Sequence, residues 1–183
     1  MNSLTIKERQ EMFRRIDILR ACPEDVSPVY LLAIETLALT GMRTCELYRL
    51  TSDRLDVQRG LIKVRAAKGS VDHFVPVPIP FITRLKAHYD AHGSFWPQYS
   101  ESTANRLLRA FWERIRVRLL STRGQEISLH GLRASFAQQI YQKTGDIVLT
   151  QQLLGHRSLG STTSYMAAVD ITAQRSRLLK VLS

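Results

Sequence analysis

The pattern of apolar and polar residues predicts a mainly helical chain with one small β-sheet. Apolar residues recur at helical spacing over 5–21, 28–40 and about 102–120. Between residues 53 and 78 the pattern changes to two short β-branched runs, LIKVRA and HFVPVP, separated by the turn-like AKGSVD. We therefore expect an α+β fold, mainly α-helical, with a small antiparallel sheet near residues 53–78 that contains a hairpin.

Capping signals locate several helix ends. Ser27 and Pro28 are typical of a cap and a first helical turn. The run VYLLAIETLAL that follows is almost wholly apolar, which predicts a core helix ending at Gly41. Shorter helices are expected at 43–50 and 80–91, and three or four more at 130–143, 146–154, 161–168 and 171–182. No linker is long enough to divide the chain, so we expect a single domain over 1–183, in which 1–25 forms a short arm or helix.

The segment 102–120 carries two different faces. The expected apolar stripe consists of Leu107, Leu108, Phe111, Trp112, Ile115 and Leu119. The opposite face is rich in arginine, which matches the composition of the whole chain. The net charge is +10, with 26 Lys and Arg against 16 Asp and Glu. Such a charge favours nucleic acid as partner over a basic surface that serves only solubility. The arginines expected to contact DNA are Arg106, Arg109, Arg114, Arg116 and Arg157.

The sequence also indicates the cellular compartment of the protein. No apolar run reaches the ~18 residues of a membrane span, and the polar start MNSLTIKERQEMFRR has no signal-peptide core. We expect a cytoplasmic, DNA-associated protein without a membrane partner. Cys22 and Cys45 are too few for a disulfide framework or a zinc cluster, and we expect buried structural thiols.

Two segments near the predicted sheet carry charged candidates. In TGMRTCEL, Arg43 follows a glycine break and shares a helical face with Glu46, which could orient it toward a phosphate. Taken alone, such a pair is more often a surface ion pair. Lys68 stands at the expected tip of the hairpin, where a lysine is usually only solvated but could also reach a phosphate or donate a proton.

Two further segments carry histidines. His130 and Arg133 lie three residues apart near an expected helix N-terminus, where free amides already favour an anion. A capping histidine beside a surface arginine is the alternative. In LLGHRSLGSTTSY, His156 precedes Tyr165 by nine residues. A core tyrosine is the common interpretation, yet the Ser/Thr run before it predicts weak packing that would suit a hydroxyl nucleophile.

Together these residues indicate phosphoryl transfer. Two arginines and two histidines can surround a phosphodiester whose charge grows in the transition state. A tyrosine of pKa ~10 needs a base to become nucleophilic, and a lysine can protonate the leaving oxygen. The pattern calls for no metal and no cofactor, because two histidines with scattered carboxylates do not form a zinc motif.

The order and spacing of these motifs resemble the catalytic domain of the tyrosine recombinases, the phage integrase family. The similarity runs from about residue 27 to 170. HxxR alone is a weak motif, whereas HxxR followed by LGHxxxxxTxxY is specific, and Thr162 occupies the usual threonine position. Its implied fold is that of the tyrosine recombinase catalytic domain.

The resemblance also implies roles for the site residues. Tyr165 would attack a scissile phosphate to form a 3′-phosphotyrosyl bond, with Lys68 as general acid and His130 as acid–base partner. Arg43, Arg133 and His156 would hold the non-bridging oxygens, and Glu46 would support them. The implied activity is site-specific recombination of double-stranded DNA without metal or ATP.

The family also implies that four protomers assemble on two paired DNA sites. The free protein could be a monomer. Accessory DNA-binding proteins would be further partners. The segment 171–183 would form a C-terminal helix that packs either in its own subunit or on a neighbour. The resemblance implies a bacterial protein, in which we expect the N-terminal clamp domain of most family members to be absent. The chain would then be either a small recombinase similar in layout to the fimbrial-switch invertases or a fragment of a longer protein.

Two alternatives stay open at this point. One is a type IB topoisomerase-like enzyme that relaxes DNA without a synaptic partner. The other is a non-catalytic DNA-binding regulator that retains the fold, against which the intact set of six residues argues.

Overall fold

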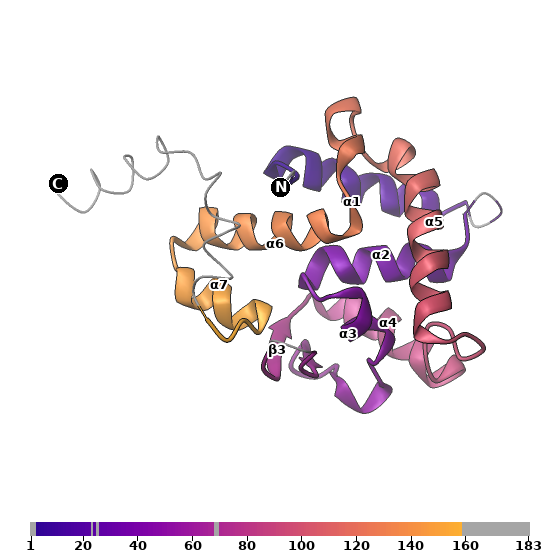
Figure 1. Cartoon of the computed structure of the whole chain (residues 1–183). Helices are drawn as coiled ribbons and strands as arrows, with labels where there is room; N and C mark the ends of the chain where they lie inside the picture. Colours follow the sequence, from indigo (N-terminus) through magenta and orange to yellow (C-terminus); the bar gives the residue numbers. More distant parts are fainter. Residues whose placement is uncertain (1–2, 23, 25, 68–69, 159–183) are drawn as a thin grey trace.

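The computed structural model describes residues 3–22, 24, 26–67 and 70–158 (Figure 1). Its helices are α1 (Ile6–Arg20), α2 (Pro28–Thr40), α3 (Thr44–Tyr48), α4 (Ile79–His92), α5 (Glu101–Leu119), α6 (Leu129–Thr144) and α7 (Ile147–Leu154), with 3₁₀ turns η1 (Ser52–Arg54) and η2 (Thr122–Glu126). The strands are β1 (Leu55–Asp56), β2 (Leu61–Val64) and β3 (His73–Pro76). The predicted α+β class is confirmed. The expected helices at 161–168 and 171–182 lie outside the described residues.

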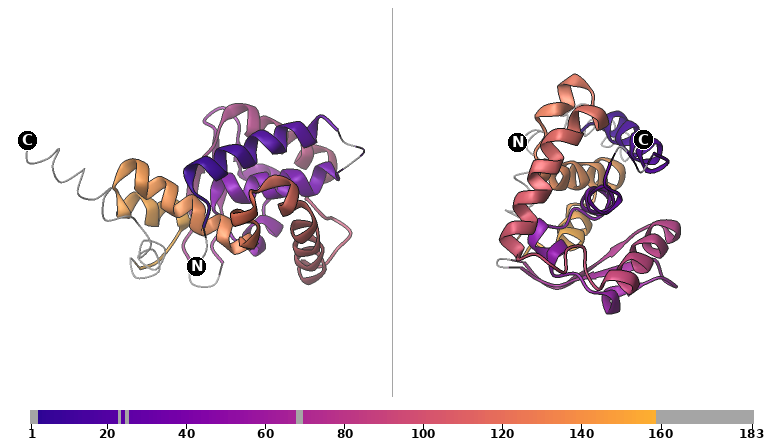
Figure 2. Two further views of the ribbon diagram at one scale, coloured as in Figure 1. Left: turned by 90° about the horizontal axis from the view of Figure 1, so that it is seen from above. Right: turned by 90° about the vertical axis from the view of Figure 1, so that its right-hand side faces the viewer.

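The apolar helix α2 is the centre of the core, as predicted. It contacts α1, α3, α5 and α6, and Figure 2 shows α1 on one side of it and the sheet with α4 on the other. Pro28 occupies the first turn, although the Ser27 side chain makes no capping hydrogen bond. Because α2 is covered on several sides, it can be apolar around most of its circumference.

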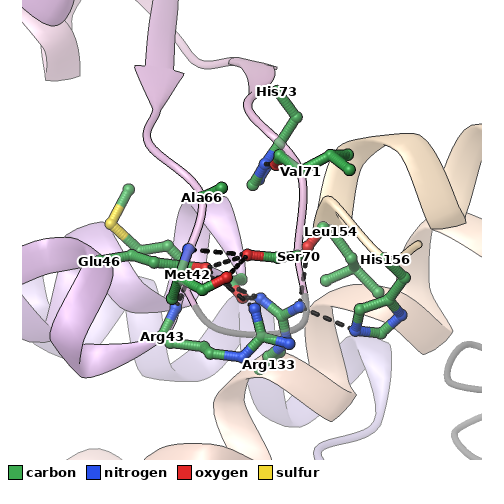
Figure 3. Close-up of polar contacts among 12 residues, drawn as sticks. Met42, Arg43, Glu46, Ala66, Ser70, Val71, His73, Arg133, Leu154 and His156 are labelled. Carbon is green, nitrogen blue, oxygen red and sulfur yellow. Dashed lines mark hydrogen bonds and ion pairs between the residues drawn. The ribbon is translucent and has the colours of Figure 1, made fainter.

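The three strands form an antiparallel sheet in the order β1-β2-β3. The register pairs Ile62 with Val75 and Val64 with His73, so the inward residues of the two longer strands meet on one face. The predicted hairpin is therefore confirmed. Residues 65–67 and 70–72 extend from it toward α3 and the end of α7, which places them beside the segments that carry Arg43 and His156 (Figure 3).

The amphipathic helix α5 buries one stripe, with one correction. The buried residues are Ala104, Leu108, Phe111, Trp112, Ile115 and Leu119. Leu107, which was expected in the buried stripe, is only half-buried, and Ala104 is buried in the stripe instead. A helical period of 3.6 residues aligns position 104 with 108 and 111, and a small residue there allows close packing.

The N-terminal segment folds onto the domain. Thr5 and Glu8 form a capping box at the start of α1, and α1 contacts α2 and α5. The buried Arg9 guanidinium lies over the rings of Phe13 and Phe136, at 5.2 and 5.8 Å, and desolvation lowers its pKa to about 10. Of the two forms expected for 1–25, an arm or a helix, residues 6–20 adopt the helix.

The structure also tests the predictions about the cysteines and about membrane-spanning helices. The cysteines are not buried: Cys22 is exposed and Cys45 is half-buried, because both lie at helix ends rather than on core faces. No helix among the described residues is both long and apolar enough to cross a membrane.

Gly41 ends α2 where the chain turns toward Arg43. Its φ is +64°, and a Cβ there would lie 2.5 Å from Phe136 Cδ1. Gly41→Ala should lower the free energy of unfolding in urea by about 2–4 kcal/mol, from backbone strain plus the clash. Gly93→Ala is the matched control, since Gly93 has φ +74° with no atom within 4 Å, and should cost only about 1–2 kcal/mol. Equal losses in both variants would contradict this packing role.

Candidate active site

Arg133 is the buried centre of the candidate site. It lies in the second turn of α6 and is only 1% exposed. Its guanidinium donates to the Gly41 carbonyl at 2.6 Å and to the Leu154 carbonyl at 2.8 Å. These carbonyls stand at the C-terminal ends of α2 and α7, where helices leave acceptors unpaired. The alternative of a surface arginine is therefore wrong, and Arg133 joins three helices at one point (Figure 3).

Arg43 and Glu46 form an ion pair whose carboxylate is fully buried. Arg43 Nη1 donates to Glu46 Oε1 at 2.9 Å, and the Arg43 backbone N–H donates to Oε2 at 2.7 Å. The Glu46 side chain is 0% exposed, whereas that of Arg43 is 27% exposed. Arg133 Nη1 lies 3.8 Å from the same carboxylate. The pair is thus not a surface ion pair, and two cations share one anion.

His156 lies against Arg133 at the end of α7. Arg133 Nη2 and His156 Nε2 are 2.8 Å apart. Because a guanidinium only donates hydrogen bonds, Nε2 is the acceptor, and a neutral ring then carries its proton on Nδ1. Burial, followed by the charges of Arg133 and Arg43, lowers the pKa of His156 to about 4. The ring is therefore neutral at physiological pH.

His130 and Arg133 open onto a common cleft of about 650 Å³. The cleft lies between the start of α3, α5 and the start of α6, and its walls include Arg43, Arg109 and Cys45. Desolvation of the His130 ring and the nearby charges of Arg133 and Arg43 lower its pKa. The cleft thus presents guanidinium groups and a neutral imidazole, a combination that favours a bound anion.

Ser70 is a site residue that the sequence-based predictions missed. It is buried on the hairpin loop, and its hydroxyl lies 3.3 Å from Glu46 Oε1. Its backbone forms a bridge with His156, and its carbonyl accepts a hydrogen bond from Arg157 Nε at 3.2 Å. The only sign of its role in the sequence was its position two residues after Lys68. Many serines in loops lie close to a lysine, so this position alone does not indicate a site residue.

His73 was also missed. It is buried at the start of β3, and its Nδ1 donates to the Val71 carbonyl at 2.9 Å, while the Val71 N–H donates to the Gly155 carbonyl at 2.9 Å. Desolvation is the main cause that lowers the pKa of His73. These contacts hold the hairpin against the end of α7, next to His156.

The predicted site residues fall into three groups. The structure brings together Arg43, Glu46, Arg133 and His156 through direct contacts, and places His130 on the wall of the same cleft. Lys68 and Tyr165 lie outside the described residues, as does Thr162. Among the described residues, no three His, Cys, Asp or Glu side chains are grouped so that they could hold a metal ion.

The five arginines expected to contact DNA differ in their surroundings. Arg106, Arg109 and Arg114 are exposed on α5, and Arg109 lines the cleft. Arg116 is half-buried and engaged within the chain, where it forms an ion pair with Glu113 at 2.6 Å and bonds the Gln125 carbonyl. Arg157 is exposed but bound to the hairpin through Ser70. Their contact with DNA stays a prediction.

Comparison with known proteins gives a consistent set of relatives. The model of the phage integrase family matches residues 10–170. The tyrosine recombinase XerA of Thermococcus kodakarensis is 34% identical over 138 residues, which cover 68% of this chain and 46% of that protein. XerD of Pseudomonas aeruginosa is 30% identical over 164 residues, covering 82% and 54%. The chain thus spans about half the length of the curated relatives it matches.

Solved structures agree on the fold. The XerH site-specific recombinase bound to difH substrate superposes with a TM-score of 0.72 at 22% identity, covering 97% of this chain and 54% of that one. A lambda integrase dimer bound to a COC′ core site gives a TM-score of 0.64 at 22% identity, covering 90% and 47%. The expected catalytic-domain fold is confirmed.

The environment of His156 generates a pH prediction. Its folded pKa of about 4 lies below the ordinary value of 6.5, so between these pH values the unfolded chain binds a proton that the folded chain does not. The free energy of unfolding should therefore fall as pH drops from 6.5 to 4. Nitrogen-15 NMR of the labelled imidazole should show a neutral ring protonated at Nδ1 down to about pH 4. A midpoint near 6.5, or a proton on Nε2, would contradict the contact with Arg133.

Proposed function

The chain belongs to the phage integrase family, and from that premise we propose that it is a tyrosine site-specific recombinase that cleaves and rejoins double-stranded DNA. The observation that carries the proposal is the convergence of the Arg43 and Arg133 guanidiniums on the buried Glu46 carboxylate, at the wall of a cleft. One carboxylate cannot neutralise two guanidiniums, so a positive charge remains for a phosphodiester.

The residues around this charge would stabilise the transition state. Arg43 is the more accessible of the two arginines and would contact a non-bridging oxygen directly. Arg133 is held in place by two carbonyls, so its positive charge would stabilise the transition state without reorganisation. His156 would contribute its Nδ1–H as a neutral donor.

The proposed reaction exchanges one phosphodiester for another. The Tyr165 oxygen attacks the scissile phosphorus, its phenolic proton passes to His130, and a 3′-phosphotyrosyl bond forms as the bond to the 5′ oxygen breaks. Lys68 protonates that leaving oxygen. A 5′-hydroxyl then attacks the phosphotyrosine and releases Tyr165, so the bond is conserved and neither ATP nor water is consumed. The lowered pKa of His130 keeps the ring unprotonated and able to accept the proton.

DNA is the partner that the charge and the family support. The net charge of +10 favours DNA, and the exposed arginines of α5, of which Arg109 lines the cleft, would contact its phosphates. The matched structures include a lambda integrase tetramer bound to a Holliday junction. We propose the same arrangement here, four protomers on two paired sites, with residues 171–183 as the segment that packs on a neighbouring copy and accessory proteins adding to site affinity.

The topoisomerase-like and regulator alternatives make different predictions. The named relatives are tyrosine recombinases, which favours recombination over relaxation. A relaxing enzyme would form the same covalent adduct but would not exchange strands between two separate duplexes. A regulator would bind DNA and form no adduct.

The central prediction concerns Tyr165. On a library of nicked duplexes with randomised sequence, from which the short 5′-hydroxyl fragment diffuses away, the unaltered chain should accumulate SDS-resistant protein–DNA adducts. Tyr165→Phe should form none, because phenylalanine has no nucleophilic oxygen, while its DNA binding by mobility shift stays within about twofold. Tyr99→Phe is the matched control and should form adducts normally, since Tyr99 is exposed and is not among the residues that line the cleft.

Two outcomes would contradict the proposal. Adducts that persist in Tyr165→Phe would assign the nucleophile elsewhere. A chain that binds the library but yields no adduct on any member would instead support the regulator. Sequencing of the trapped duplexes would give the target site, and two copies of that site on separate duplexes would then test strand exchange.

A further inference from the structure

Ser70 lies where the hairpin loop meets the arginine pair. It is 1% exposed, although it belongs to a loop between strands. Its hydroxyl is 3.3 Å from Glu46 Oε1, and its backbone pairs with His156. The residue therefore touches both the Arg43–Glu46 pair and the segment that carries the second histidine. A buried hydroxyl at such a junction needs hydrogen-bond partners, and these partners indicate what it does.

The hydroxyl has one proton and two acceptors within reach. The Ala67 carbonyl lies at 2.9 Å and Glu46 Oε1 at 3.3 Å. The Ala67 carbonyl already accepts the Ser70 backbone N–H at 3.0 Å, whereas Oε1 carries a negative charge that strengthens any bond it accepts. The Ala67 N–H donates to the hydroxyl oxygen at 2.8 Å, which fixes the oxygen in place. The hydroxyl can donate to either acceptor, and the negative charge on Oε1 favours Glu46.

Around Glu46 the donors are divided between two oxygens. Oε2 accepts the Arg43 N–H, with Arg133 Nη1 at 3.8 Å. Oε1 accepts Arg43 Nη1 at 2.9 Å and faces Ser70. Ser70 is the neutral side-chain donor among these contacts. A hydrogen bond from Ser70 to Oε1 would weaken the hydrogen bond between Oε1 and Arg43 Nη1. The Arg43 guanidinium would then be better able to bind an incoming anion.

We propose that Ser70 is a positioning residue, whose hydroxyl holds the Glu46 carboxylate so that Arg43 can present its guanidinium to a phosphate. The inference rests on the proposed function for its role in cleavage. Its role in anion binding stands on the contacts alone. Without the hydroxyl, Oε1 would bind Arg43 more tightly or rotate with it, and the cleft would hold an oxyanion less well.

The test measures anion binding first, since this needs no DNA site. Tungstate, a tetrahedral oxyanion, is titrated calorimetrically into the full chain at low ionic strength. Ser70→Ala should weaken tungstate binding roughly tenfold, the effect of one hydrogen bond to a charged group. The matched control is Ser52→Ala, which removes a hydroxyl that donates to the Asp90 carboxylate at 2.6 Å in an exposed contact outside the lining of the cleft. This variant should bind tungstate like the unaltered chain.

A double-mutant cycle separates positioning from general damage. Glu46→Gln removes the charge through which Ser70 acts, so adding Ser70→Ala to Glu46→Gln should change tungstate affinity less than about twofold. Thermal denaturation of each variant tests whether the fold is kept. If Ser70→Ala fails to fold, Ser70→Cys replaces it, because a thiol is of similar shape but a weaker donor. Independent, additive effects of the two substitutions, or an unchanged affinity in Ser70→Ala, would overturn the proposal.

Cleavage of the trapped duplexes is the second readout. At saturating DNA, Ser70→Ala should form adducts roughly tenfold more slowly, with unchanged DNA affinity. If the unaltered chain forms no adduct while Ser70→Ala still weakens tungstate, the proposed function fails and the positioning role stands. If adducts form at equal rates in both chains, the positioning role fails and the proposed function stands.

Discussion

The buried guanidinium of Arg133 is the interaction on which the site depends. A cation that is 1% exposed is stable only when its donors are paired, and here the partners are the Gly41 and Leu154 carbonyls and His156. Gly41 follows α2, whereas Leu154 and His156 both lie at the end of α7. The requirement to satisfy one buried charge therefore fixes the ends of α2 and α7 relative to α6, and it brings His156 and the Glu46 carboxylate, which also binds Arg43, to the same guanidinium.

The second organising feature is an excess of positive charge over its counterion. Glu46 is shared by Arg43 and Arg133, so the pair is positioned but not neutralised. The same charges, together with burial, lower the pKa values of His130 and His156, and both rings remain neutral near pH 7. Under the proposed function, this cleft would hold an oxyanion, donate hydrogen bonds to it and keep an unprotonated imidazole nearby, which are the requirements of phosphoryl transfer.

Local patterns in the sequence predicted much of this arrangement. The spacing of Arg43 and Glu46 and the strand–turn–strand pattern of the hairpin depend on neighbours in the chain, so they could be read directly. Ser70 and His73 could not, because their contacts reach 24 residues back to Glu46 and forward to the end of α7. The burial of Arg133 could not be predicted from the sequence either, because an HxxR motif on a helix does not indicate which carbonyls surround the arginine. The exposed Cys22 shows the limit of arguing burial from residue type.

The most direct measurement of this account compares the free energies of unfolding of Arg133→Lys and Arg43→Lys. Lysine keeps the positive charge at both positions but cannot reproduce the fork of donors that Arg133 uses. We expect a loss of about 2–4 kcal/mol for Arg133→Lys, from hydrogen bonds of a buried charge left unmade. We expect about 1 kcal/mol or less for Arg43→Lys, because position 43 is partly exposed and a lysine there keeps the charge that pairs with Glu46. Equal losses in the two variants would show that Arg133 does not hold the site together.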